Sequence, residues 1–511
     1  MAHDPLRPAG FDKGKPLLPA ASQKPVGAPL GPAQASPRPT GETIPLKPEA
    51  PKRPAGIPAE LKEPRLASLD AYRGFIMLLM ASAGFGLARV FARLAAAGLT
   101  DESREYRVVR FFSGQFEHAL WQGGVFWDLI QPAFMFMVGA ALPYSFARRA
   151  ARGDSYFSRL LHTLVRCVVL VALGVFLNNP DGGKEPYTVY SFANVLAQIG
   201  LGYWFVFLFV NRGVWVQGVA IALVLAGTWY AFFQHPLPPE GFDYASVGVL
   251  NDKDRDEYVL PGLRGHWSKN TNFAATVDRD LLNKFPRTMP VRREEGESEE
   301  AYAVRVEANR QKARFQFNSG GYATLNFVPA IATMLLGLMI GELLRDKSRG
   351  SGRKIIVMLA AGAGCLTLGI ALHYAGVCPI VKRIWTPSWA LASGGLVIWM
   401  LALFYLVFDH WGWRRMAWPL AIVGMNSIVV YMLAQPQLLK PWTLRVLYTH
   451  LSVPYAYFTN WLSEQTGRSY SPALFGGASD PYQPLYESLA VLAAFWLVCL
   501  WLWRQRITVR I

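Results

Sequence analysis

Long apolar stretches dominate this 511-residue sequence and restrict its fold more than any other feature. A helix needs about 20 predominantly apolar residues to cross a bilayer, and hydrophobic residues make up 52% of the chain. We therefore predict an all-α protein, a polytopic membrane bundle of about ten transmembrane helices in the lipid bilayer. The candidate spanning segments are residues 72–95, 124–146, 157–177, 189–210, 214–233, 322–344, 355–374, 389–408, 418–434 and 485–503.

The segments that follow every second span are short and basic. They contain Arg148, Arg149, Arg152, Arg212, Arg345, Lys347, Arg349, Arg353, Lys354, Arg414, Arg415, Arg504, Arg506 and Arg510. Because short basic loops remain in the cytoplasm, this pattern predicts that both termini are cytoplasmic. The same loops explain the formal net charge of +16, so we predict no nucleic-acid partner.

The remaining segments differ in composition from the spans. Residues 1–63 are rich in Pro, Ala and Lys and contain no apolar run, which predicts a disordered cytoplasmic tail. Residues 64–511 then form the membrane domain, with outer excursions at about 96–123, 234–321 and 438–484. The mixture of Glu, Arg and Ala at 294–316 predicts a solvent-exposed helix in the second excursion.

Several classes of site are not expected from the sequence. The four cysteines are Cys167, Cys365, Cys378 and Cys499, and no two of them form a CxxC pair. We predict neither a disulfide framework nor a zinc site, and no other metal or tightly bound cofactor. The sequence also shows none of four common motifs in the structural context that each requires: a P-loop, a GxSxG elbow, an HExxH motif or a dinucleotide fingerprint.

Ionisable residues inside a membrane are costly and call for a functional hypothesis. Asp128 lies in an otherwise apolar block, and His118 precedes it by ten residues. A carboxylate can orient a histidine that accepts and returns a proton. On one straight helix the two would be about 15 Å apart, so contact requires a break, which Gly123-Gly124 offers. The alternative is an interfacial histidine and an unrelated helix-packing aspartate, and residue types alone favour it.

Two further pairs of charged residues share a helix face. Asp70 and Arg73 are three apart at the start of the first segment, where they form either a local ion pair or part of a substrate site. His162 and Arg166 are four apart in the third segment. They either bind an anion or pair with a neighbouring helix.

Other polar residues have two interpretations each. Asn426 lies within the ninth segment, and Gln198 lies within the fourth. A lone amide of this kind more often joins helices than performs catalysis. Lys382 and Arg383 lie at the outer end of the eighth segment, as interface anchors or as contacts for a bound anion.

Several motifs resemble the transmembrane catalytic domain of heparan-α-glucosaminide N-acetyltransferase and its bacterial relatives. The most specific motif matches in order and spacing, and it comprises His118, Trp121, Gly123, Asp128, Pro132, Phe136 and Gly139. Shorter matches are residues 68–74, 379–388 and 424–427, with a stretch around Asp278 in the second excursion. The resemblance covers most of the chain after about Arg65.

The resemblance implies a membrane-embedded acyltransferase in a bacterial inner membrane. In this family acetyl-CoA donates an acetyl group from the cytosolic side to a glucosamine amine on the far side. Carried over by position, His118 and Asp128 are the expected catalytic residues. The expected substrate-binding residues are Trp121, Asp278, Lys382 and Asn426, and the acceptor is a saccharide. Basic residues near the cytoplasmic side, Arg73, Arg148 and Arg149, are expected to bind the phosphates of acetyl-CoA.

One position departs from the family pattern. Animal members have a catalysis-associated Asn in the first helix, where this sequence has Gly84. The chain between Gly84 and His118 is also longer, with a charged insertion at about 89–115. Ser82, Gln115 and Glu117 are candidates to replace the missing amide.

Two other functions remain open at this point. A transporter of a sugar, a lipid-linked sugar or an organic anion would also carry sparse charges within its helices. A scaffold in an envelope complex could use the N-terminal tail to recruit partners. The sequence leaves open the acceptor, the length of the acyl group and the oligomeric state, with a homodimer among the options.

Overall fold

The structure is a computed structural model that describes residues 66–179, 188–285, 291–435, 440–477 and 479–509. Within these ranges every regular element is a helix, and one isolated β-bridge joins Gly123 to Val381. The predicted all-α class is confirmed. The tail predicted at residues 1–63 lies outside the described residues.

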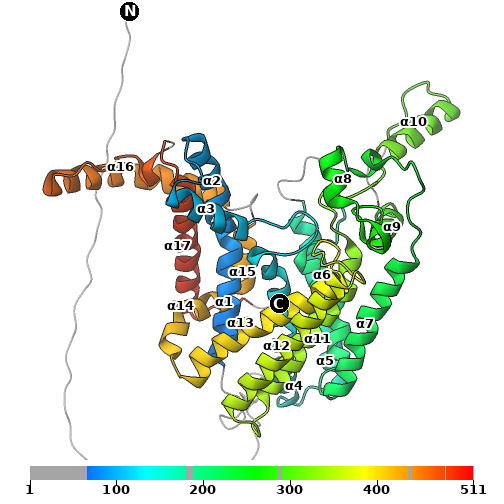
Figure 1. Ribbon diagram of the computed structural model, residues 1–511, viewed down its shortest axis with the longest axis horizontal. Coiled ribbons are helices and arrows are strands. Elements are labelled where there is room, and N and C mark those ends of the chain that lie inside the picture. Colours follow the sequence, from blue (N-terminus) through cyan, green and yellow to red (C-terminus); the bar gives the residue numbers. More distant parts are fainter. Residues whose placement is uncertain (1–65, 180–187, 286–290, 436–439, 478, 510–511) are drawn as a thin grey trace, which may run out of the picture. The chain divides into compact units, whose positions relative to one another are not determined.

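Eight helices in the described ranges are long and apolar enough to cross a membrane, in agreement with the predicted polytopic bundle (Figure 1). Their length and hydropathy are those of helices that bury their backbone polar groups in lipid. The main helices of these spans are, in chain order, α1 (Ala67–Ser82), α4 (Ile130–Ala150), α5 (Tyr156–Leu177), α7 (Val214–Gln234), α11 (Phe327–Arg345), α12 (Ser351–Tyr374), α13 (Pro387–Tyr405) and α17 (Gln483–Arg504). The span that contains α1 continues to Ala96.

Two of the ten predicted segments are not straight spans. Segment 418–434 comprises α14 (Arg414–Met425) and α15 (Ser427–Leu433), which meet at Asn426 with a bend of 65°. Segment 189–210 contains only the 14-residue α6 (Val195–Leu208). This helix begins late because the Asn194 side chain accepts a hydrogen bond from the amide of Ala197 at 2.9 Å and caps it.

Glycines allow neighbouring spans to pack backbone against backbone. A Cβ atom added to Gly337 of α11 would lie 2.0 Å from the carbonyl oxygen of Phe136 on α4. α1 and α14 meet in the same way through Gly74 and Gly424, where an added Cβ would lie within 2 Å of the opposite backbone. Small residues permit this close approach, and dispersion contacts then hold helices together in lipid.

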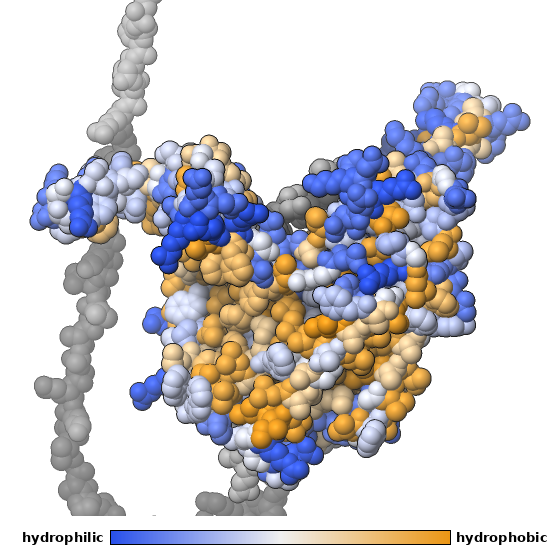
Figure 2. Space-filling model, in the orientation of Figure 1, coloured by the Kyte–Doolittle hydropathy of each residue, from blue (hydrophilic) through white to orange (hydrophobic). Residues whose placement is uncertain are grey.

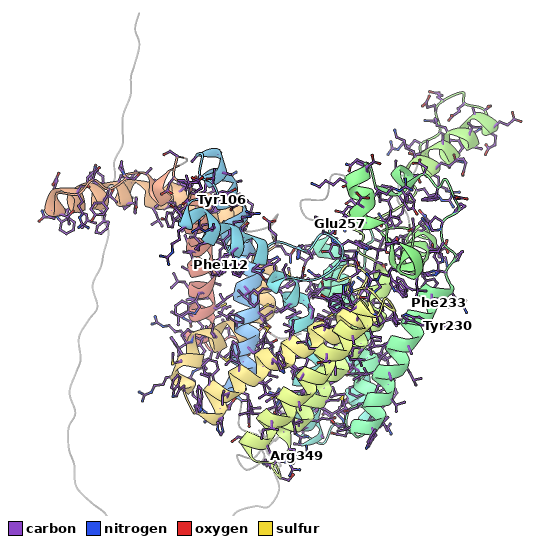
Figure 3. All side chains as sticks on the ribbon, viewed as in Figure 1. Tyr106, Phe112, Tyr230, Phe233, Glu257 and Arg349 are labelled. Atoms are coloured by element: carbon purple, nitrogen blue, oxygen red, sulfur yellow. The ribbon has the colours of Figure 1, made fainter. Side chains whose placement is uncertain are left out.

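Contacts between helix termini gather the basic loops at one end of the bundle, which we call the basic end. These contacts are Ala67 to Asp409, Ser351 to His410, Lys354 to Leu344, Asn211 to Glu342, Phe207 to Phe146 and Tyr156, and Trp418 to Trp503. Figure 3 labels Arg349 at this end, and Tyr106 and Glu257 at the other. Figure 2 shows hydrophobic surface over the spans and hydrophilic surface toward both ends, as expected for a membrane protein.

The described parts of the three predicted excursions lie at the opposite end, which we call the His118 end. The first contains α3 (Arg104–Gln115), the second α8 (Asp252–Tyr258), α9 (Phe273–Leu282) and α10 (Glu299–Lys312), and the third α16 (Lys440–Thr466). None of the residues of α10 is buried, which confirms the predicted solvent-exposed helix. The hydroxyl of Tyr482 donates to the carboxylate of Glu105 at 2.5 Å and so joins the third excursion to the first.

Candidate functional site

The loop between α3 and α4 brings His118 and Asp128 together. Residues 116–125 are not helical, and Gly123 within them has φ +90°. Gly124 has no room for a side chain, because a Cβ atom there would lie 2.5 Å from the Trp389 ring. The break predicted at these two glycines is present, and the Nδ1 atom of His118 lies 2.7 Å from Oδ1 of Asp128. The interpretation of an unrelated aspartate is therefore wrong.

Asp128 is fully buried in the helical turn Phe126–Leu129, which leads into α4. Its Oδ2 atom accepts hydrogen bonds from the backbone amides of Ala119 and Val125, both at 3.2 Å. These two amides fix the carboxylate within the loop that carries His118. Backbone donors of this kind stabilise a buried negative charge.

Lys382 is the third member of the cluster. Its Nζ atom lies 2.9 Å from Oδ1 of Asp128 and 3.0 Å from Nδ1 of His118. Burial lowers the pKa of Lys382 below its ordinary value, and the Asp128 carboxylate acts in the opposite direction. The sequence predicted that Lys382 binds substrate. The structure instead directs its ammonium group at the carboxylate, with 8% of the side chain exposed.

The contact between His118 and Asp128 assigns the tautomer of His118. An ionised carboxylate is an acceptor only and an ammonium is a donor only. The shorter contact of Nδ1, at 2.7 Å from Asp128, assigns a proton to this nitrogen. Lys382 then donates to the same carboxylate oxygen, and its 3.0 Å approach to Nδ1 is a contact between two donors and not a hydrogen bond. The neutral imidazole then has its lone pair on Nε2. Because 43% of the His118 side chain is exposed, this nitrogen is the atom available to a substrate.

A rigid loop before α13 positions Lys382. The amide of Gly123 donates to the carbonyl oxygen of Ile380 at 2.8 Å, which ties this loop to the His118 loop. Three more hydrogen bonds hold this loop. Val381 N donates to Thr386 Oγ1 within the loop, Ser388 Oγ of α13 donates to Pro379 O, and Nδ2 of Asn326, the residue before α11, donates to Arg383 O. The buried Trp385 has φ +48°. A bulky residue in this conformation costs on the order of 1–3 kcal/mol and is kept where the surroundings enforce it.

The structure places two other predicted substrate residues inside the protein. Trp121 is 1% exposed, and its indole Nε1 donates to the carbonyl oxygen of Trp267 at 3.1 Å. Asp278 on α9 is 3% exposed, and both of its carboxylate oxygens accept from the amide of Thr324, at 3.0 and 3.2 Å. Burial raises the pKa of Asp278, while the hydrogen bonds from Thr324 oppose the shift. Trp121 thus joins the first excursion to the second, and Asp278 joins the second to the chain that leads into α11.

Asn426 is separate from the His118 cluster. It lies at the bend between α14 and α15, fully buried. Its side-chain oxygen accepts from the amide of Val509 at 3.0 Å, and its Nδ2 atom donates to the carbonyl oxygen of Ile507 at 3.5 Å. The amide side chain thus joins a broken span to a backbone segment that follows α17.

Gly84 lies next to the chain that carries His118. Residues 83–86 all have positive φ, between 48° and 67°, so α1 ends there and the chain turns into α2 (Leu87–Ala96). A Cβ atom at Gly84 would lie 2.9 Å from the carbonyl oxygen of Phe116, two residues before His118. The position aligned with the family Asn therefore borders the candidate site.

The three polar residues considered as replacements for that Asn make local hydrogen bonds. Ser82 donates to the carbonyl oxygen of Leu79 on its own helix at 2.7 Å. Glu117 accepts from Ser113 at 3.3 Å, and Gln115 accepts from the amide of Phe126 at 3.5 Å. Gln115 and Glu117 thus stabilise the two ends of the His118 loop.

The arginines expected to bind acetyl-CoA lie toward the basic end. Arg148 and Arg149 are in the last turn of α4, and Arg149 pairs with Asp154 at 3.1 Å. Arg73 lies in the second turn of α1. Arg166 is near the middle of α5, where it donates to the hydroxyl of Tyr203 at 3.1 Å. Its Nε atom is buried and has no hydrogen-bond partner.

A recess of about 340 Å³ also opens at the basic end. It is lined by residues of mixed charge, namely Asn211, Glu342, Arg345, Asp346 and Lys347. None of the residues of the His118 cluster lines it. In the described residues, no group of three or more His, Cys, Asp and Glu could hold a metal ion.

Comparison with known proteins relates the chain to one group of enzymes. It is 24% identical to the heparan-alpha-glucosaminide N-acetyltransferase of Homo sapiens over 402 residues, which is 72% of this chain and 52% of the human protein. The chain is related to this acetyltransferase. The enzyme of that name from Mus musculus is 23% identical over 403 residues, 72% of this chain and 53% of its own length.

The relationship agrees with the resemblance expected from the motifs around His118. The chain spans about half the length of the curated relatives that it matches. No family model matches it.

Proposed function

We propose that the protein is a membrane-embedded acetyltransferase that moves an acetyl group from acetyl-CoA to an amino sugar or another glycan. The carrying observation is the cluster of His118, Asp128 and Lys382, in which a carboxylate holds Nδ1 of a half-exposed histidine. The relationship to heparan-alpha-glucosaminide N-acetyltransferase supports this reaction class. His118 is the proposed general base, and Asp128 orients it.

The proposed step uses the free Nε2 atom of His118. The acceptor amine attacks the carbonyl carbon of the acetyl thioester while Nε2 accepts the proton of the amine. The new C–N bond forms, the C–S bond breaks, and the leaving CoA sulfur takes the proton from Nε2. Asp128 stabilises the imidazolium that forms in between, as in acyl-transfer triads.

We propose that the basic end faces the cytoplasm of a bacterial inner membrane and that the His118 end faces outward. The positive-inside rule supports this orientation. Acetyl-CoA would approach from the basic end, with its phosphates near Arg73, Arg148 and Arg149, and its pantetheine arm would thread between the helices toward His118. The saccharide acceptor would approach from the opposite side, where His118 is exposed.

Purified protein in nanodiscs, supplied with labelled acetyl-CoA and amino sugars, tests the proposal. Wild type should transfer label to the sugar, and His118→Ala should remove this transfer while the variant keeps its elution volume and thermal unfolding. The control is His450→Ala, which changes an exposed histidine of α16. Full activity of His118→Ala would exclude the assigned base. Sugar uptake into vesicles without release of CoA would instead establish a transporter.

A further inference from the structure

α16 is a long helix that lies outside the set of spans. It has 27 residues but does not qualify as a membrane-crossing helix. Figure 1 shows α16 at the upper end of α17, from which it projects sideways, whereas α17 and α1 run along the length of the bundle. A helix in this position lies parallel to the membrane plane if α17 crosses the membrane.

The projecting helix carries an apolar stripe. Leu447, Leu451, Pro454, Phe458 and Trp461 are spaced i, i+4, i+7, i+11 and i+14, which places them along one face. Leu451 is 43% exposed, Phe458 55% and Trp461 54%. Tyr457, four residues before Trp461, is exposed as well and borders this face, whereas the exposed Val453 lies on the opposite side, beside Thr449. Contiguous exposed apolar surface of this kind marks an interaction site.

Protein covers the other side of the same helix. Thr459 and Ser463, each two residues from Trp461 and thus roughly opposite to it on a helix, face the chain that returns toward α17. Thr459 is 3% exposed, and Ser463 accepts from the amide of Tyr470 at 3.1 Å. Nearer the start of α16, Tyr448, on the flank between the two sides, donates to Glu487 of α17 at 2.8 Å. These contacts fix the rotation of α16, so the described residues leave the stripe exposed from Leu451 to Trp461, while Leu447 is half-buried.

We infer that α16 is an interfacial helix whose stripe of Leu447, Leu451, Pro454, Phe458 and Trp461 lies in the lipid headgroup region at the His118 end. The occupant follows from continuity with α17, which is itself a span whose exposed side chains face lipid at Leu489 and Leu497. A helix that leaves the end of this span sideways meets the bilayer surface. Trp and Tyr are the residues that favour this interface, and apolar faces of surface helices insert shallowly into it.

The inferred helix also connects the membrane surface to the lobe that carries His118. Gln483 at the start of α17 donates to the hydroxyl of Tyr448 at 2.8 Å, and its side-chain oxygen accepts from Arg93 of α2 at 3.0 Å. α2 and α3 lead directly into the His118 loop. These bonds connect α16, through the start of α17, to the segment that leads into the His118 loop.

A matched pair of labelled variants tests this placement. Leu451→Cys and Thr449→Cys are two residues apart, nearly opposite on the helix, and both positions are exposed. Each variant is reconstituted in phosphatidylcholine nanodiscs and labelled with an environment-sensitive fluorophore. The unsubstituted protein, labelled in the same way, measures the background fluorescence from native cysteines. Quenchers are lipids that carry a nitroxide at the headgroup or at a shallow acyl position, and iodide in the water.

The lipid nitroxides should remove most of the fluorescence at Leu451→Cys, and iodide should remove most of it at Thr449→Cys. Phe458→Cys should behave like Leu451→Cys and checks the stripe at a second site. Equal iodide quenching at Leu451 and Thr449 without lipid quenching would place α16 in water and overturn the inference. Protection of Leu451→Cys from both quenchers, together with cross-linked dimers, would assign the stripe to a second copy of the chain and overturn it as well.

Discussion

The buried pair of Lys382 and Asp128 predicts that replacing both residues recovers part of the protein's stability but does not recover acetyl transfer. Lys382 is 8% exposed at its side chain, Asp128 is 1% exposed, and the two atoms are 2.9 Å apart. Removal of one partner leaves a buried charge without compensation, which costs about 3–5 kcal/mol. We expect Lys382→Met to lie near the lower value, because Ala119 and Val125 still donate to Asp128. Asp128→Asn should also destabilise the protein, by stranding the ammonium.

The double variant Asp128→Asn/Lys382→Met removes both charges. Its destabilisation should be smaller than the sum of the two single variants by about 2–3 kcal/mol, within the range measured for residues in contact. Reversible unfolding in mixed micelles titrated with SDS measures all four proteins. Additivity to within about 0.5 kcal/mol would refute the pairing.

Acetyl transfer should not recover in the double variant. An amide at position 128 presents a donor where the carboxylate accepted, so Nδ1 of His118 becomes the acceptor and the proton moves to Nε2. The histidine then has no lone pair for the acceptor amine. Loss of kcat on the order of 10⁴-fold is known for this change in a triad. A stable double variant with normal kcat would contradict the role proposed for Nε2.

Two further predictions concern packing and pH. Gly337→Ala should destabilise the bundle by about 1–3 kcal/mol through overpacking against Phe136. The control Gly364→Ala, on open helix surface, should be neutral or stabilising by up to about 1 kcal/mol. Unfolding in SDS compares the two variants, and equal effects would refute the close approach of α11 and α4. The hydrogen bond from Arg305 holds the pKa of Glu297 below its usual value. The stabilisation by this ion pair is fully present above the ordinary glutamate pKa and is lost as the pH falls through the lowered pKa of Glu297. Hydrogen exchange in α10 should therefore become faster in that pH range. Arg305→Gln should remove this pH dependence, and an unchanged dependence would refute the assignment.

Local sequence patterns predicted much of the fold because a bilayer imposes a local rule. Each span must satisfy its own backbone and present apolar side chains, so length and composition within one segment suffice. All ten predicted segments contain helices for this reason. The pattern failed at residues 189–210, where the capping side chain of Asn194 rather than hydropathy sets the start of α6.

The candidate site was only partly predictable from the sequence. Family spacing pointed to His118 and Asp128, and the two glycines between them indicated where the helix would break. Lys382 was assigned to substrate, since no local rule relates it to a carboxylate 254 residues earlier. Trp121 and Asp278 belong to matching motifs, yet their side chains are buried in packing contacts.

The sequence by itself therefore determined that this chain is an all-helical membrane protein, where its spans lie, and which histidine and aspartate to consider. Those properties depend on the composition of single segments and on the spacing within one motif. The tertiary structure decided that Lys382 joins His118 and Asp128, that Asn426 contacts the chain after α17, and that α16 lies across a span. Each of these depends on which distant segments pack together, and side-chain geometry across such contacts is set by the whole fold.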